Sequence, residues 1–166
     1  MNSSQFDFFK LANNSFKFRL FLLYKLPAAF FSGIKVKEIN GEKCITSVPY
    51  KWLTQNPFRS VYFASLAMAA EMSTGAIALS NVYKRKPSVS MLVTKMEATY
   101  FKKATDTIYF ICEQGKEIYA VIDEAIKTSE AKIIVAKSVG KNKSGEIVAE
   151  FLFTWSFKAK SPGIET

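Results

Sequence analysis

Residues 60–79 form the segment that most constrains how this chain can fold. Over these positions the sequence has no proline and one charge, Glu71, and most of its side chains are small: alanine, serine, threonine and glycine. A helix that is apolar on every side must be buried all round. The length would also suit a membrane span, but the central carboxylate and the strands around the segment favour a buried core helix.

Most of the remaining chain predicts β-strands. Residues 34–39 and 43–48 flank Asn40-Gly41, a strong hairpin signal. Alternating apolar positions predict further strands over 88–100, 105–113, 131–141 and 146–159, whereas helical spacing predicts an inserted helix over 116–128. One side of the last strand should face the core, namely Phe151, Phe153, Trp155 and Phe157. The order of elements is typical of an α+β domain in which an antiparallel sheet packs on one long helix.

We predict a single domain over residues 1–166, because 166 residues with 49% hydrophobic content suffice for one core. Residues 1–26 should be a helical segment, interrupted near Asn13-Asn14-Ser15 and ended by Pro27. Residues 28–33 would then connect to the first strand, and residues 160–166 would form a tail.

The absence of histidine removes whole classes of chemistry. Ser-His-Asp triads, Cys-His pairs and histidine-bearing zinc sites are excluded, which leaves carboxylates, lysines, hydroxyls and backbone dipoles for any catalysis. Cys44 and Cys112 are far apart in the sequence, and we interpret both as reduced core residues. We therefore expect no metal site, and no cofactor other than coenzyme A carried by a substrate.

The net charge of +9 fits a solvated basic surface, a phosphate-bearing ligand, nucleic acid or an anionic membrane. The apolar run at residues 20–24 is interrupted by Lys25 and Pro27, too early for a membrane span or a signal peptide. A cytoplasmic location is therefore expected. Binding to nucleic acid or to a membrane surface ranks last, because it rests on charge alone.

Particular residues carry a resemblance to hotdog-fold thioesterases of the phenylacetate-pathway type, and closer still to the DUF4442 branch of that superfamily. Leu26-Pro27 and Gly33 precede the first strand, Asn56 opens the loop before the central helix, and Glu71 follows fifteen positions later. The similarity covers roughly residues 26–157. It implies an antiparallel sheet wrapped around the helix, the hotdog fold.

The resemblance also implies an activity, hydrolysis of an acyl-CoA thioester, in a pocket between two copies that join along the strand at residues 88–100. Glu71 would be general base or nucleophile, with Asn56 as a second catalytic residue. A free N–H at the helix N-terminus would polarise the thioester carbonyl. The implied substrate-binding residues are Phe58, Arg59, Ser60, Tyr62, Phe63 and Ala64. A homodimer is the minimum assembly, and a tetramer is left open.

Each of these residues also has a purely structural interpretation. Glu71 could pair with Arg59, a lysine or a tyrosine hydroxyl at a subunit interface, because an unpaired buried carboxylate is costly. Asn56 before Pro57, or Ser60, could cap the helix, and the aromatic residues could be plain core. The hydrolases carry glycines where this chain has Tyr62-Phe63-Ala64. That difference keeps a second function open, an acyl or acyl-CoA binding protein without turnover.

Overall fold

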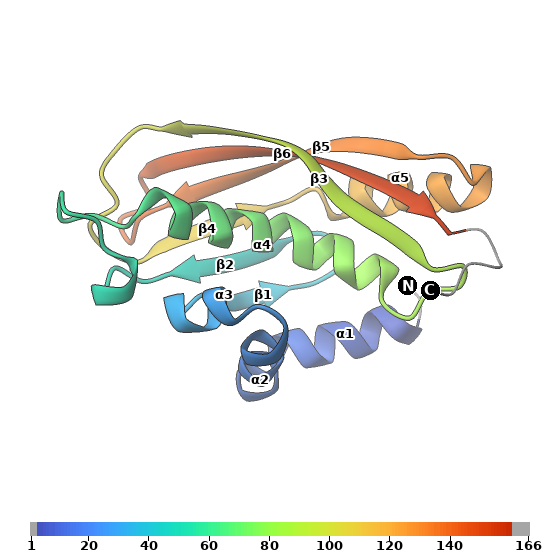
Figure 1. Ribbon diagram of the computed structural model, residues 1–166, viewed down its shortest axis with the longest axis horizontal. Helices are drawn as coiled ribbons and strands as arrows, with labels where there is room; N and C mark the ends of the chain where they lie inside the picture. Colours follow the sequence, from blue (N-terminus) through green and yellow to red (C-terminus); the bar gives the residue numbers. More distant parts are fainter. Residues whose placement is uncertain (1–2, 161–166) are drawn as a thin grey trace.

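A six-stranded antiparallel sheet curves around one long helix in the computed structural model, which describes residues 3–160 (Figure 1). The strands lie in the order β1-β2-β4-β5-β6-β3. Their bounds are Lys35–Ile39 (β1), Cys44–Val48 (β2), Val89–Tyr100 (β3), Ile108–Cys112 (β4), Lys132–Lys141 (β5) and Ile147–Ala159 (β6). This is the α+β hotdog architecture that the sequence predicts.

The central helix α4 spans Phe63–Val82 and begins three residues later than the sequence suggests. Its small side chains, among them Ala69, Ala70 and Ala78, are fully buried because the sheet approaches the helix closely. The predicted inward face of β6 is confirmed, since Phe151, Phe153, Trp155 and Phe157 are all buried. By length and composition α4 could cross a membrane, but here it is the core helix of the domain.

Three helices precede the sheet: α1 (Ser3–Asn13), α2 (Ser15–Lys25) and α3 (Pro27–Ser32). Asn14 separates the first two, and its side chain caps α2 by accepting a hydrogen bond from the N–H of Lys17 at 3.0 Å. The prediction for residues 28–33 is wrong. Pro27 does end α2, but it also occupies the first turn of α3, where a missing N–H and a fixed φ favour a new helix.

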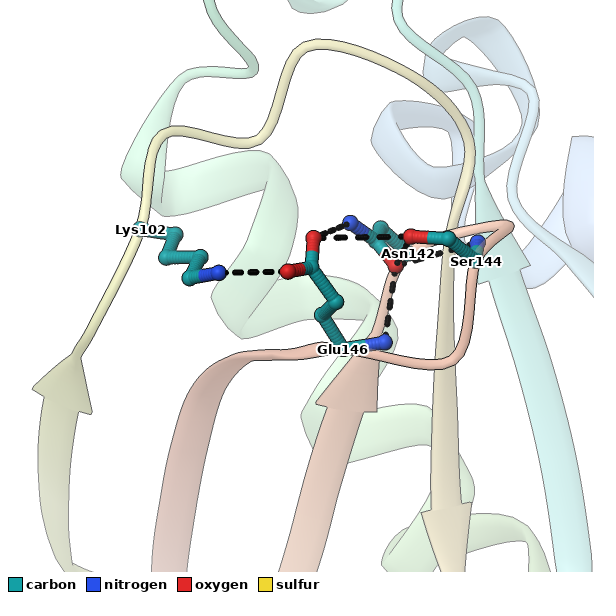
Figure 2. A network of polar contacts seen from close by, with 4 residues as sticks. All are labelled: Lys102, Asn142, Ser144 and Glu146. Atoms are coloured by element: carbon teal, nitrogen blue, oxygen red, sulfur yellow. Dashed lines mark hydrogen bonds and ion pairs between the residues drawn. The ribbon is translucent and has the colours of Figure 1, made fainter.

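Side chains of the turns fix both predicted hairpins. Asn40 closes the β1–β2 turn by accepting hydrogen bonds from the N–H groups of Glu42 and Lys43. In the β5–β6 turn, Asn142 accepts from the N–H groups of Ser144 and Glu146 (Figure 2). The Glu146 carboxylate also binds Lys102, so this turn holds the loop that follows β3.

Strand β3 is a free edge of the sheet, paired on one side only with β6. A bulge between Val93 and Lys95 shifts its register, and most of the residues beyond it are exposed. Exposed apolar side chains on this edge include Leu92, Met96 and Tyr100. A long exposed edge of this kind is a template for pairing with another strand.

The two cysteines, distant in sequence, lie directly opposite each other on β2 and β4. Both are free and buried, as predicted. Helix α5 (Gly115–Thr128) fills the predicted insertion and buries Ile118 and Ile122. Gly115 is required there, because a Cβ would lie 2.4 Å from the carbonyl oxygen of Gly41.

Candidate functional site

The carboxylate of Glu71 stands without a polar partner in the middle of α4. No hydrogen bond or ion pair to it is formed by any residue between 3 and 160 of the same chain. The predicted alternative, pairing at a subunit interface, stays a prediction. Burial raises the pKa of Glu71 to about 7, and no nearby charge contributes to that shift. A carboxyl group that titrates near neutrality can exchange a proton with a reacting group.

Glu71 borders a small, mainly apolar cavity of about 120 Å³. Three parts of the protein form its walls: α4, the N-terminal helices and the start of β3. The lining residues other than Glu71 are Phe8, Phe18, Phe21, Leu26, Met72, Gly75, Ala76, Leu79 and Met91. An apolar wall weakens the solvation of a carboxylate, which is the physical cause of the raised pKa.

One turn further along α4, Gly75 leaves room for the Glu71 carboxylate. A Cβ on Gly75 would lie 2.6 Å from Oε1 of Glu71, so the carboxylate occupies the space that a side chain would need. Beside it, the indole N–H of Trp155 donates to Oγ1 of Thr74 at 3.0 Å, which ties α4 to β6.

The N-terminus of α4 offers free hydrogen-bond donors. Tyr62 is the N-cap residue and has no side-chain capping bond. Its carbonyl oxygen accepts from Ser65 and Leu66, whereas the N–H groups of Phe63 and Ala64 have no acceptor within the described part of the chain. Such orphan N–H groups, with the partial positive charge of the helix end, suit an anion or a developing oxyanion.

An open groove of about 570 Å³ lies beside this helix end. It is lined by five of the predicted site residues, Asn56, Phe58, Ser60, Tyr62 and Phe63, together with Pro57, Val61, Leu66, Tyr100, Phe101, Lys102, Lys103 and Ala104. Phe58, Tyr62 and Phe63 are exposed, so they are groove surface and not plain core. Arg59 and Ala64 do not line the groove.

The loop before α4 is organised by Asn56. Its Oδ1 accepts from the N–H of Phe58 at 2.9 Å and of Ser60 at 3.2 Å, and its Nδ2 donates to Oγ of Ser60 at 3.0 Å. Neither Asn56 nor Ser60 caps α4, so that interpretation is wrong, because the helix begins only at Phe63. Arg59 adopts a left-handed conformation with φ of 59° at the tip of this turn.

Within one chain, Glu71 and the groove are separate. Glu71 follows Phe63 by eight residues, which is about 12 Å along a helix axis, and Glu71 is not among the groove residues. Met91, near the start of β3, borders the Glu71 cavity, whereas Tyr100, at the end of β3, borders the groove. The two halves of the candidate site therefore lie toward opposite ends of the edge strand.

Sequence reasoning missed several residues of the site. Gly75 is the one glycine in the buried helix and stands four positions after Glu71, a spacing that places both on one face. No local sequence pattern predicts that Met91 and the N-terminal helices line the Glu71 cavity. No group of three or more His, Cys, Asp or Glu side chains that could hold a metal occurs among residues 3–160.

Solved structures similar to this one include several thioesterases. PA5026 of Pseudomonas aeruginosa, a protein of unknown function described as a probable thioesterase, has 18% identity and a TM-score of 0.73, over 87% of this chain and 96% of that one. OLEI01261 of Chlorobaculum tepidum, of unknown function, also has 18% identity, with a TM-score of 0.76 over 96% and 100% of the two chains.

The third similar protein is the thioesterase enzyme SAV0944 of Staphylococcus aureus, solved as two variants. A glutamate is replaced by alanine in one variant, which has 13% identity and a TM-score of 0.58 over 80% of this chain and 98% of that one. In the other variant, the glutamine fifteen positions earlier is replaced by alanine. That structure has 14% identity and a TM-score of 0.56 over 78% of this chain and 97% of that one. At such identities, these likenesses establish the fold.

The family of the chain follows from its sequence. Among curated proteins, none matches it. The family model described as a domain of unknown function, DUF4442, matches residues 17–157, which include most of α2, every element from α3 to β5, most of β6, and all residues of the candidate site except Phe8. The chain belongs to the DUF4442 family, and its fold is that of thioesterase-like hotdog proteins.

Proposed function

We propose that the protein is a thioester hydrolase that acts on acyl-CoA, with Glu71 activating the attacking water. The observation that carries this proposal is a carboxylate without a polar partner, in an apolar cavity, with its pKa raised to about 7. A base of that pKa is half deprotonated at neutral pH and can accept the proton of a water molecule as it attacks the thioester carbon.

The N-terminus of α4 would stabilise the transition state. As water adds to the carbonyl carbon, negative charge develops on the carbonyl oxygen, and the free N–H groups of Phe63 and Ala64 can donate hydrogen bonds to it. The tetrahedral intermediate then expels the thiolate of coenzyme A, which takes up a proton. The products are a carboxylic acid and free coenzyme A.

A second copy of the chain would bring the two halves of the site together. If two copies pair antiparallel about the midpoint of β3, Met91 of one copy lies opposite Ala98 of the other, two residues from the groove residue Tyr100. The Glu71 cavity of one copy would then face the groove of the second. The unpaired edge of β3 supports this arrangement, because pairing would cover its exposed backbone.

Two further features support the proposal. Lys103 lines the groove beside the helix end, Arg59 lies in the loop before α4, and neither is ion-paired within the described residues, so both can bind phosphate groups. Asn56 and Glu71 also share the fifteen-residue spacing of the glutamine and glutamate that were replaced in SAV0944. We assign Asn56 the role of shaping the loop that carries the groove.

A second candidate function is binding of an acyl ligand without turnover. It is favoured by one observation: the exposed ring of Phe63 stands at the free N–H groups. The hotdog hydrolases that this chain resembles usually carry glycine there. A glycine would let a ligand approach the backbone more closely.

Thiol release from short, long and aromatic acyl-CoAs distinguishes the two functions. Hydrolysis predicts release with at least one substrate and a loss of about 10³-fold in kcat for Glu71→Gln. The control Glu150→Gln removes a carboxylate from the outer face of β6 and should leave the rate unchanged. Thermal shifts by acyl-CoAs without any thiol release would contradict hydrolysis and support binding alone.

A further inference from the structure

Helix α2 is apolar on two opposite faces. Phe18 and Leu22 are buried against the rest of the protein. A second set points outward and is exposed: Phe16, Leu20, Leu23 and Tyr24, with Phe16 at 74% and Tyr24 at 83% exposure. The exposed positions follow the spacing i, i+4, i+7 and i+8, so they form one stripe along the helix. Packing within the protein accounts for the inner face only.

The position of α2 leaves this stripe accessible. In Figure 1 the helix is seen almost end-on at the lower margin of the molecule, away from the sheet. The chain continues with two more exposed apolar side chains, Leu26 at 46% and Phe31 at 57% exposure. The stripe therefore belongs to a wider apolar surface on the N-terminal helices.

Positive charge surrounds the stripe. Residues 8–37 contain no acidic side chain and six basic ones, Lys10, Lys17, Arg19, Lys25, Lys35 and Lys37. Three of these, Arg19, Lys35 and Lys37, line a cavity of about 210 Å³ between α2 and β1 that has no carboxylate among its lining residues. An acidic residue lies at each end of this range: Asp7 on α1, and Glu38, which is ion-paired with Lys43 at 3.1 Å.

We propose that this surface binds bilayers that contain anionic phospholipids, with α2 lying in the membrane interface. The apolar stripe would enter the boundary between headgroups and acyl chains, while Lys17 and Lys25 would contact lipid phosphates. An exposed apolar stripe with a lysine beside it (Lys17) and another at the end of the helix (Lys25) fits the pattern of interfacial helices. From the sequence, membrane binding ranks low because charge is its only support. The exposed apolar stripe is a second, independent observation in favour of membrane binding.

A second copy of the chain fits this surface less well. A symmetric contact through α2 would bring Lys17 and Lys25 of both copies together, and the helix has no acidic residue to pair with them. The lipid surface instead supplies the opposite charge.

Membrane binding would place the bilayer close to the candidate site. The inner face of α2 contributes Phe18 and Phe21 to the Glu71 cavity, so only the thickness of one helix, about 10 Å, separates the cavity from the proposed lipid surface. Binding itself does not depend on hydrolysis, so the two proposals can fail independently.

Flotation with vesicles tests the proposal directly. The native protein should float with phosphatidylcholine vesicles containing about one quarter phosphatidylglycerol, and remain unbound with phosphatidylcholine alone. Binding should weaken at high salt. The double variant Phe16→Ser, Leu20→Ser should lose at least tenfold in affinity, and Lys17→Gln, Lys25→Gln should lose about thirtyfold.

The matched control removes apolar side chains elsewhere. Ile133→Ser, Val135→Ser changes two residues of β5 that are similarly exposed, at 66% and 51%, and should float like the native protein. Equal loss in this control, no binding to anionic vesicles, or binding that is insensitive to Phe16→Ser, Leu20→Ser would overturn the proposal. So would a smaller assembly of that variant on size-exclusion chromatography without vesicles, since the stripe would then be a contact between copies.

Discussion

Gly75 leaves room for the carboxylate of Glu71: a Cβ at position 75 would lie 2.6 Å from Oε1 of Glu71 and 3.3 Å from the ring of Trp155. The two residues are one helical turn apart on α4, and both border the same cavity. A side chain at position 75 would therefore require the carboxylate to move.

Gly75→Ala should displace Glu71 without unfolding the protein. Alanine gains up to about 1 kcal/mol of helix propensity over glycine, which offsets part of the strain. We expect the free energy of unfolding to change by less than about 2 kcal/mol, while kcat for thioester hydrolysis falls at least tenfold. Chemical denaturation and thiol release measure the two quantities. Unchanged turnover in this variant would show that the position of Glu71 does not matter.

Glu71 should make stability depend on pH. Its pKa is raised from 4.5 to about 7 by burial, so between these values the folded protein retains a proton that the unfolded chain has released. The free energy of unfolding therefore falls as pH rises through this window. Glu71→Gln removes the effect and should be more stable than the native protein by about 2–3 kcal/mol at pH 8, but not at pH 4. Equal stability differences at both pH values would contradict the raised pKa.

The bond between Trp155 and Thr74 should contribute to stability through its hydroxyl group. Thr74→Val keeps the shape but leaves the buried indole N–H without an acceptor, which costs about 1–3 kcal/mol. Thr74→Ser retains an acceptor and should cost less. Urea denaturation of both variants makes the comparison. A smaller loss for valine than for serine would mean that the methyl group of Thr74 matters more than its hydrogen bond.

Cys44 and Cys112 should be unreactive in the folded protein. Burial raises the pKa of Cys112 to about 11 and also raises the pKa of Cys44, so almost no thiolate forms at neutral pH. An aromatic disulfide reagent should label neither cysteine at pH 8 in native conditions and both in guanidinium chloride. Rapid labelling of the native protein would contradict their burial.

The sequence predicts the architecture well because burial leaves a local pattern. Uncharged small residues predict α4, and alternation predicts the inward face of β6. The ends of helices and strands are harder to predict. Helix α3 is not predicted, because Pro27 ends one helix and also starts the next. No pattern in the sequence predicts that Glu71 and the groove are separate within one chain. Their separation depends on the length of α4 between its first residue and Glu71. The exposed apolar stripe of α2 could not be predicted either. The sequence pattern of a helix with two apolar faces does not show which face packs against the rest of the protein.

A mixing experiment tests most directly whether Glu71 of one copy acts with the helix N-terminus of another. Phe63→Pro removes one free N–H and suits the first helical position, since Tyr62 already has the extended conformation that proline requires. Glu71→Gln and Phe63→Pro should each be nearly inactive. Phe63→Ala, which keeps the N–H, should retain most of the activity.

When the two inactive variants are unfolded, mixed in equal amounts and refolded, half of the dimers should be mixed. Each mixed dimer would contain one intact site, so thiol release should recover to about one quarter of the native rate. No recovery above the separate variants, although mixed dimers form, would contradict a site shared between two copies.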